Sequence, residues 1–100
     1  MAPAGGEPPR PETHVTVRYW ASARAAAGVP EEIITLLGPV MLDRLLAAIL
    51  ERHADAPGLG KVLHVCSVLV DGAQVRTQDP TTVEVRDGAG VEFLPPFAGG

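Results

Sequence analysis

The chain is poor in cysteine and in aromatic residues. Cys66 is the single cysteine among 100 residues, and one thiol excludes both an internal disulfide and a metal or iron–sulfur site built on several cysteines. Aromatic side chains make up only 4% of the sequence. Because 46% of the residues are nevertheless hydrophobic, a normal share for a globular protein, the composition predicts one small domain with a single hydrophobic core.

Long apolar runs and an excess of positive charge are also missing. The best apolar stretch, Ile33 to Leu50, is broken by Gly38, Pro39, Asp43 and Arg44, whereas a membrane-spanning helix needs about 20 apolar residues. Twelve acidic against eight basic residues give a net charge of -4, so no basic surface is predicted to displace counterions from phosphates. We therefore expect neither a membrane nor a nucleic acid as partner.

The first twelve residues, MAPAGGEPPRPE, contain four prolines and two glycines. This composition predicts a disordered leader over residues 1–12. The leader has no apolar core of the kind that a secretory signal peptide requires. We therefore expect a cytoplasmic protein whose ordered domain begins at residue 13.

Two strands and a short helical turn are expected in the first third of the chain. In residues 13–20, valine and tyrosine alternate with polar residues, which is the period-two pattern of a half-buried strand. The alanine-rich stretch Ala21 to Ala27 predicts a helical turn that Gly28 and Pro30 end. Glu31 to Leu37 has β-branched residues at its centre and predicts a second strand.

The clearest helix is expected next. Five apolar residues recur at the spacing of one helical face: Leu42, Leu45, Leu46, Ile49 and Leu50. Pro39 suits the first turn of this helix, and the segment from Ala54 to Gly58 ends it. Burial of this apolar stripe is expected to be the largest single contribution to the core.

Strands dominate the predicted second half. The near-continuous apolar run Val62 to Val70 is typical of a strand buried on both faces. Asp71-Gly72 predicts a tight turn into a short returning strand, Ala73 to Arg76. By periodicity, Val83 to Val85 is a strand that pairs with the last strand, Val91 to Leu94. The order β-β-α-β-β-β predicts an α+β fold in which one mixed sheet covers one main helix.

The usual catalytic motifs are absent from the sequence. It lacks a glycine-rich loop ending in Lys-Ser/Thr, a His-Glu-x-x-His pair and a Gly-x-Ser-x-Gly turn, and we expect no bound cofactor and no metal. His53 is expected to cap the end of the helix. Cys66 is expected to be a buried core residue, because apolar surroundings raise the pKa of a thiol. Trp20 either faces a partner or packs under residues 21–27, and both readings stay open.

The C-terminus differs from the rest of the chain because it ends in Gly99-Gly100 shortly after a strand. Pro95-Pro96 stiffens the exit from that strand, so that the tail is projected rather than trailing, and Phe97 adds an apolar anchor. Two residues without Cβ atoms let backbone pass through a slot too narrow for any side chain. We therefore predict that residues 97–100 form a short flexible tail that can carry the terminal carboxylate of Gly100 into the pocket of a partner.

Three stretches of the sequence resemble the MoaD/ThiS family of ubiquitin-like sulfur carriers. They are VRYWASARAAAGV (17–29), LVDGAQV (69–75) and RDGAGVEFLPPFAGG (86–100). The resemblance implies a β-grasp domain over residues 13–96, in which Pro80 to Val85 is a turn or short helix rather than a strand. The sequence departs from the family pattern in two places. Ala25 follows Arg24 where an acid is frequent, and Ala89-Gly90 stands where Asp-Glu is frequent.

The resemblance also implies how the tail works. An E1-like adenylating enzyme activates the Gly100 carboxylate at the expense of ATP, and a sulfur donor displaces AMP to leave a thiocarboxylate. The match is closest to the MoaD branch, the small subunits of molybdopterin synthase, whose tail enters a MoaE-like large subunit and donates sulfur in molybdenum cofactor biosynthesis. The chain would then be a carrier and not an enzyme. Its partner-binding residues would be Gly99, Ala98, Phe97, Pro96 and Pro95.

Three other functions stay open at this point. The chain could carry sulfur for thiamine or another thio-metabolite. It could be a ubiquitin-like modifier that is joined to lysines of other proteins through Gly100. It could also be a β-grasp binding domain with an inert tail, which would tolerate additions to its C-terminus.

Overall fold

The computed structural model describes residues 11–96. Their secondary structure follows the chain in this order: β1 (Glu12–Tyr19), α1 (Ala21–Ala27), β2 (Glu31–Leu37), β3 (Val40–Met41), α2 (Leu42–Arg52), α3 (Leu59–Val65), β4 (Ser67–Val70), β5 (Ala73–Gln74), β6 (Glu84–Val85) and β7 (Gly90–Leu94). The α+β class is confirmed, although this part of the chain has three helices where one main helix and one helical turn were expected. Most of the predicted leader lies outside the described residues, and β1 already begins at Glu12.

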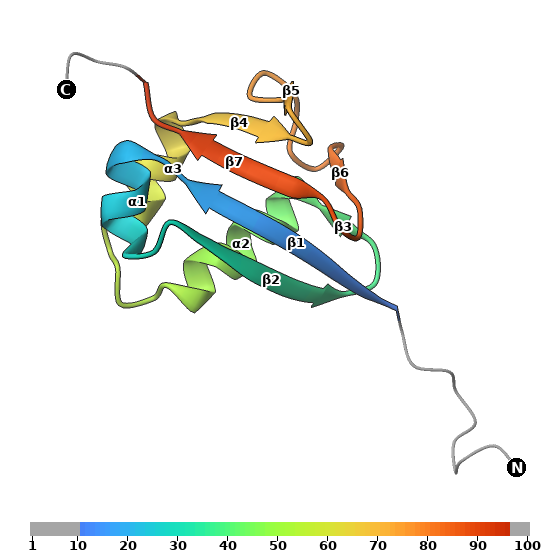
Figure 1. Ribbon diagram of the computed structural model, residues 1–100. Helices are drawn as coiled ribbons and strands as arrows, with labels where there is room; N and C mark the ends of the chain where they lie inside the picture. The colour runs from blue at the N-terminus through green and yellow to red at the C-terminus, as the bar shows by residue number, and fades with distance from the viewer. Residues whose placement is uncertain (1–10, 97–100) are drawn as a thin grey trace, which may run out of the picture.

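A five-stranded mixed sheet forms the body of the molecule, with its strands in the order β2-β1-β7-β4-β5. The last strand, β7, lies in the middle, parallel to β1 and antiparallel to β4. Helix α2 crosses behind the sheet in Figure 1. Because β1 and β7 are parallel neighbours, the chain enters the sheet at one end and leaves it at the other.

The predicted elements of the first third are confirmed. Val15, Val17 and Tyr19 of β1 are buried, while the polar residues between them are exposed or half-buried. Helix α1 ends where Gly28 takes a φ of +81° and donates its N–H to the carbonyl of Arg24 (2.9 Å), a left-handed C-cap that suits glycine. Strand β2 has the predicted bounds.

Helix α2 buries most of its predicted stripe, including Leu42, Leu45 and Ile49. Leu50 is 41% exposed, because it lies at the edge of that stripe and not at its centre. The prediction that Pro39 belongs to the first turn of this helix is wrong. Between Pro39 and α2 the chain forms the short strand β3, which pairs with β6.

The segment before β4 is helical, so the prediction of one long strand from Val62 to Val70 is wrong. Residues of this run belong to α3, and β4 has only four residues. Leu59 and Leu63, four residues apart on one helical face, are both buried, whereas Val65 is 43% exposed. Val62 and Val65, on either side of Leu63, join the apolar residues of β4 in one run and hide the helical spacing of Leu59 and Leu63.

The turn predicted at Asp71-Gly72 is confirmed, with φ angles of 49° and 83° that a tight hairpin requires. Strand β5 is shorter than predicted, because it ends at Gln74 and not at Arg76. The strand expected at Val83 to Val85 is present as β6, but it pairs with β3 and not with β7. Both edges of β7 are occupied by β1 and β4. The turn that the family resemblance implied covers residues 80–82.

A buried carboxylate ties three elements together behind the sheet. Glu32 of β2, whose side chain is 9% exposed, accepts hydrogen bonds from the hydroxyl of Tyr19 (2.6 Å) and from Nε2 of His53 (2.6 Å). Its other oxygen lies 3.0 Å from Nε of Arg52. His53 caps α2 only through its backbone N–H, which donates to the carbonyl of Ile49 (3.0 Å). Its side chain joins the helix end to β2 instead of capping the helix as predicted.

The hydrogen bonds around Glu32 change its proton affinity. Burial acts to raise the pKa of this carboxyl, but the hydrogen bonds from Tyr19 and His53 and the charges of His53 and Arg52 outweigh burial, so that the pKa of Glu32 is lowered. Burial and the neighbouring Glu32 raise the pKa of Tyr19, which keeps its phenol protonated as a donor. Ionised Glu32 therefore stabilises the fold above its ordinary pKa of 4.5, and this contribution is lost as the pH falls below it.

The variant Glu32→Gln tests this network. We expect the free energy of unfolding near pH 7 to fall by about 1–3 kcal/mol, because the donors on Tyr19, Arg52 and His53 lose a charged acceptor. We also expect the variant to lose less stability than the wild type when the pH is lowered to about 3.5, since the group that titrates has been removed. Urea denaturation followed by circular dichroism at both pH values measures the two effects.

The neighbouring Glu31→Gln is the matched control. Glu31 is 50% exposed in a surface ion pair, so its replacement should change the stability by less than about 0.5 kcal/mol. Equal acid sensitivity of the wild type and Glu32→Gln would contradict the role of Glu32.

Candidate functional site at the end of the central strand

The C-terminal end of β7 is held on both sides. Phe93 pairs with Tyr19 of β1 and with Val68 of β4, and Leu94 pairs with Ser67 of β4. Fixed neighbours on both edges prevent this end of the strand from fraying. The chain that follows β7 therefore starts from a rigid point.

Phe93 anchors this end of β7 in the core. Its side chain is fully buried and stacks on the ring of Tyr19, with the ring centroids 6.0 Å apart and the planes inclined by 17°. Its carbonyl accepts a hydrogen bond from the backbone N–H of Trp20 (3.2 Å), which joins β7 to the start of α1. Since side chains alternate along a strand, Glu92 and Leu94 point to the opposite, outer face of the sheet.

The sheet ends at the two prolines. Pro95 is half-buried and Pro96 is exposed, and neither has a backbone N–H with which to continue the ladder. Of the predicted site residues, these two are placed directly at the end of the central strand. The others, Phe97, Ala98, Gly99 and Gly100, lie outside the described residues.

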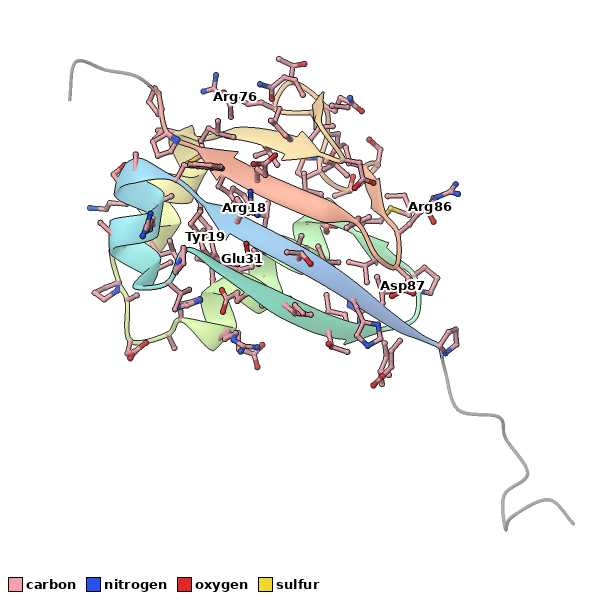
Figure 2. All side chains as sticks on the ribbon, viewed as in Figure 1. Arg18, Tyr19, Glu31, Arg76, Arg86 and Asp87 are labelled. Carbon is pink, nitrogen blue, oxygen red and sulfur yellow. The ribbon has the colours of Figure 1, made fainter. Side chains whose placement is uncertain are left out.

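A polar and aromatic cluster lies on the outer face of the sheet, over β2, β1 and β7, just before this end of the central strand. Trp20 is 42% exposed, and its Nε1 donates to Oε1 of Glu92 (3.1 Å). The guanidinium of Arg18 lies 5.8 Å from the centroid of the Trp20 ring, a cation–π distance, and also binds Glu31 (3.0 Å). Figure 2 looks onto this face and labels Arg18 and Glu31. We call Trp20, Arg18, Glu92 and Glu31 the exit cluster.

The exit cluster decides between the two readings of Trp20. The indole lies against Glu92 on the exposed sheet face and does not pack under α1. Arg18 and Glu92 were not among the predicted site residues. The alternation within β1 and β7 could have placed both on the outer face, but the contact of Glu92 with Trp20 depends on two strands far apart in the sequence being neighbours.

Cys66 is no competing reactive group. It is 1% exposed, burial raises the pKa of its thiol to about 11, and the thiol donates to the carbonyl of Val62 (3.1 Å). The prediction that it is buried in the core is confirmed. Within residues 11–96, no three His, Cys, Asp or Glu side chains gather in a way that could hold a metal ion. None of the helices in that part of the chain has the length and apolarity to cross a membrane.

The sequence profile of the ThiS family matches residues 17–100, and the chain therefore belongs to the ThiS family. The molybdopterin synthase sulfur carrier subunit of Chlamydomonas reinhardtii is 34% identical to it over 86 residues, which cover 86% of this chain and 98% of that protein. The resemblance to the MoaD/ThiS family is thus confirmed.

Solved structures share the fold, which is the ubiquitin-like β-grasp. A protein assigned as molybdopterin converting factor, subunit 1, from Pyrococcus furiosus has a TM-score of 0.69 at 27% identity, covering 84% of this chain and 98% of that chain. A chain in the complex of subunits 1 and 2 of molybdopterin-converting factor from Helicobacter pylori 26695 has a TM-score of 0.56 at 26% identity, covering 88% and 100%.

Two alanine variants should separate the anchor of β7 from its exposed neighbour. Phe93→Ala removes a fully buried ring and should cost about 3–5 kcal/mol of unfolding free energy. Trp20→Ala removes a half-exposed ring and should cost less than about 1 kcal/mol. Urea denaturation of both variants measures the difference, and similar costs would contradict the assignment of Trp20 to the exposed face.

Proposed function

We propose that this chain is the sulfur-carrying small subunit of a molybdopterin synthase and that Gly100 is its reactive end. The observation that carries the proposal is the position of β7: this central strand is fixed on both edges, and the sequence ends in two glycines six residues after it. The 34% identity to a sulfur carrier subunit over nearly its whole length supports the same function.

The chemistry begins at the terminal carboxylate. A free carboxylate is a poor electrophile, so it must first be activated. An E1-like adenylating enzyme transfers AMP from ATP to the Gly100 carboxylate and releases pyrophosphate. A sulfur donor then supplies sulfur at the sulfide level, which displaces AMP and leaves a thiocarboxylate. The sulfur of the thiocarboxylate is nucleophilic and is delivered from the end of the tail. ATP is consumed by the activating enzyme and is not held by this chain.

The residues of the tail suit entry into a partner. Gly99 and Gly100 have no Cβ atoms, so the backbone fits a narrow channel. Pro95 and Pro96 limit the directions in which the tail leaves the sheet, which lowers the entropy lost on insertion. Phe97 and Ala98 provide apolar contact at the mouth of that channel. Because Cys66 is buried with a raised pKa, the tail carries the sulfur without competition from this thiol.

The large subunit supplies the catalytic groups, and this chain positions the sulfur at the end of its tail. The likeness to a chain of a two-subunit molybdopterin-converting factor complex supports a MoaE-like partner. Trp20 of the exit cluster is joined to the end of β7 through its backbone N–H on the carbonyl of Phe93 (3.2 Å), so we expect a partner that receives the tail to cover Trp20 as well. An exposed aromatic ring with a polar rim is typical of a binding hot spot.

Conversion of the C-terminus is the direct test. When the protein is incubated with its activating enzyme, ATP and a sulfur donor, we expect the intact mass to change by one sulfur in place of one oxygen. Mass spectrometry of the intact chain and of its C-terminal peptide locates the change at Gly100. Omission of ATP is the control, and an unchanged mass with a cognate activating enzyme would reject the carrier function.

Changes at the tip of the tail should separate function from folding. Deletion of Gly100, or addition of one residue after it, should abolish sulfur transfer, because the carboxylate no longer reaches its site. The free energy of unfolding should stay within about 0.5 kcal/mol, since the β-sheet is untouched. Sulfur transfer by a chain with an added C-terminal residue would contradict the assignment of Gly100 as the reactive end.

The partner that is captured identifies the pathway. A pull-down with the full chain should recover a MoaE-like subunit, whereas a thiazole synthase would redirect the proposal to thiamine. Conjugates in which Gly100 is linked to lysines of other proteins would identify a modifier.

A further inference from the structure

Strand β2 is a long, open edge of the sheet. The sheet has two edges, and the other edge strand, β5, has only two residues, which is one of the ways in which proteins protect an edge. Strand β2 has seven residues, and Figure 1 shows it as the strand at one edge of the sheet, beside β1. An edge of this length is a template for pairing with another strand.

The register shows which backbone groups face outward from β2. The N–H of Tyr19 donates to the carbonyl of Pro30 (2.9 Å), and the N–H of Gly38 donates to the carbonyl of Pro11 (2.8 Å). In an antiparallel pair, residues that exchange hydrogen bonds alternate with residues that do not. The N–H and C=O groups of Ile33, Thr35 and Leu37 therefore point away from β1.

The side chains of this edge are unusually apolar for an exposed strand. Ile33 is 58% exposed and Leu37 is 51% exposed, which makes them the most exposed large hydrophobic residues of the described chain. Both lie on the outer face of β2, with Thr35 between them. Strand edges normally carry charges or prolines at such positions.

We propose that β2 pairs antiparallel with β2 of a second copy of this chain, around a two-fold axis at Thr35. The residues on the two sides of Thr35 match in chemistry. Ile34 and Leu36 lie directly beside it, and Ile33 and Leu37 lie one residue further out, so that all four are apolar. Pairing about this axis places Ile33 opposite Leu37 on the outer face and Ile34 opposite Leu36 on the inner face. A two-fold interface requires this self-complementarity.

Other two-fold registers are less favourable. An axis at Ile34 places Ile33 opposite Thr35, and an axis at Ile33 places Glu31 opposite Thr35. Only the axis at Thr35 pairs apolar residues with apolar residues on both faces and leaves Thr35 opposite its own copy. A threonine directly opposite a threonine is among the stabilising cross-strand pairs.

The ends of β2 are compatible with the same axis. It places Glu31 of one copy opposite Pro39 of the other, at the end where Nη1 of Arg44 donates to the carbonyls of Leu37 (2.7 Å) and Pro39 (3.1 Å). Glu31 is already bound by Nη2 of Arg18 in its own copy (3.0 Å), so this pairing leaves no unpartnered carboxylate at that end. The carbonyl of Leu37 can still accept from Ile33 of the second copy, because a carbonyl oxygen has two lone pairs.

The inner face beside this edge is also incompletely filled. A hollow of about 330 Å³ lies between β2 and α2, lined by Ile34, Thr35, Leu36, Ala48, Glu51 and Arg52. Pairing about Thr35 adds Ile34 and Leu36 of the second copy next to it. The dimer does not use the edges of β7, because β1 separates β2 from β7.

Self-association is measured by sedimentation equilibrium of the full chain. As the concentration rises from about 1 µM to about 1 mM, we expect the mass to rise from 10.4 kDa toward that of two chains. Ile33→Lys should weaken association at least about tenfold, while Val65→Lys, the same change at a 43% exposed residue of α3, should not. A wild-type mass that stays at 10.4 kDa, or equal association of Ile33→Lys and wild type, overturns the proposal.

Cysteine cross-linking tests the register. Residues that exchange hydrogen bonds across an antiparallel pair have Cα atoms about 5.5 Å apart, within the range of a disulfide. Under mild oxidation, Thr35→Cys should form a disulfide-linked dimer, and Ile33→Cys alone should not. A mixture of Ile33→Cys and Leu37→Cys should cross-link to each other. Rapid cross-linking of Ile33→Cys to itself, or none by Thr35→Cys, overturns the register.

Discussion

The parallel pairing of the first and last strands of the sheet is the contact on which the rest of the structure depends. It places β7 between β1 and β4 and thereby puts the end of the sheet, and the prolines after it, at a rigid central position. It also brings Glu92 beside Trp20, although 72 positions separate them. The exit cluster exists only because these two strands are neighbours.

Tyr19 connects that central pairing with the edge of the sheet. Its ring stacks on Phe93 of the central strand, its hydroxyl binds Glu32 of the edge strand, and the ring of His53 meets it edge-on at 6.1 Å. One buried side chain thus joins the anchor of the tail to β2 and to the end of α2. A charged acceptor in this position is tolerated because Tyr19, Arg52 and His53 supply donors to it, which offsets the cost of burying it.

Local patterns predicted the first half of the fold well, and contacts between distant segments explain most of the errors. The alternation in β1, the bounds of β2 and the stripe of α2 are properties of short windows, and all were predicted. Strand β6 pairs with β3 because β1 and β4 already occupy both edges of β7. No short stretch of the sequence shows which strands occupy those edges. Helix α3 was missed for a local reason, because Val62 and Val65 on either side of Leu63 imitate a buried strand. For the site, composition alone pointed to the tail, but only the tertiary structure brings Trp20, Arg18 and Glu92 together beside it.

The central place of β7 also bears on how the chain is made. During synthesis, β1 and β2 can form their hairpin early, but the sheet has a gap between β1 and β4 until residue 94 has left the ribosome. Contacts of such long sequence separation close late and slow the folding of a small domain. A nascent or truncated chain therefore exposes the two inner strand edges, and the domain becomes compact only when the segment that carries the tail has been added.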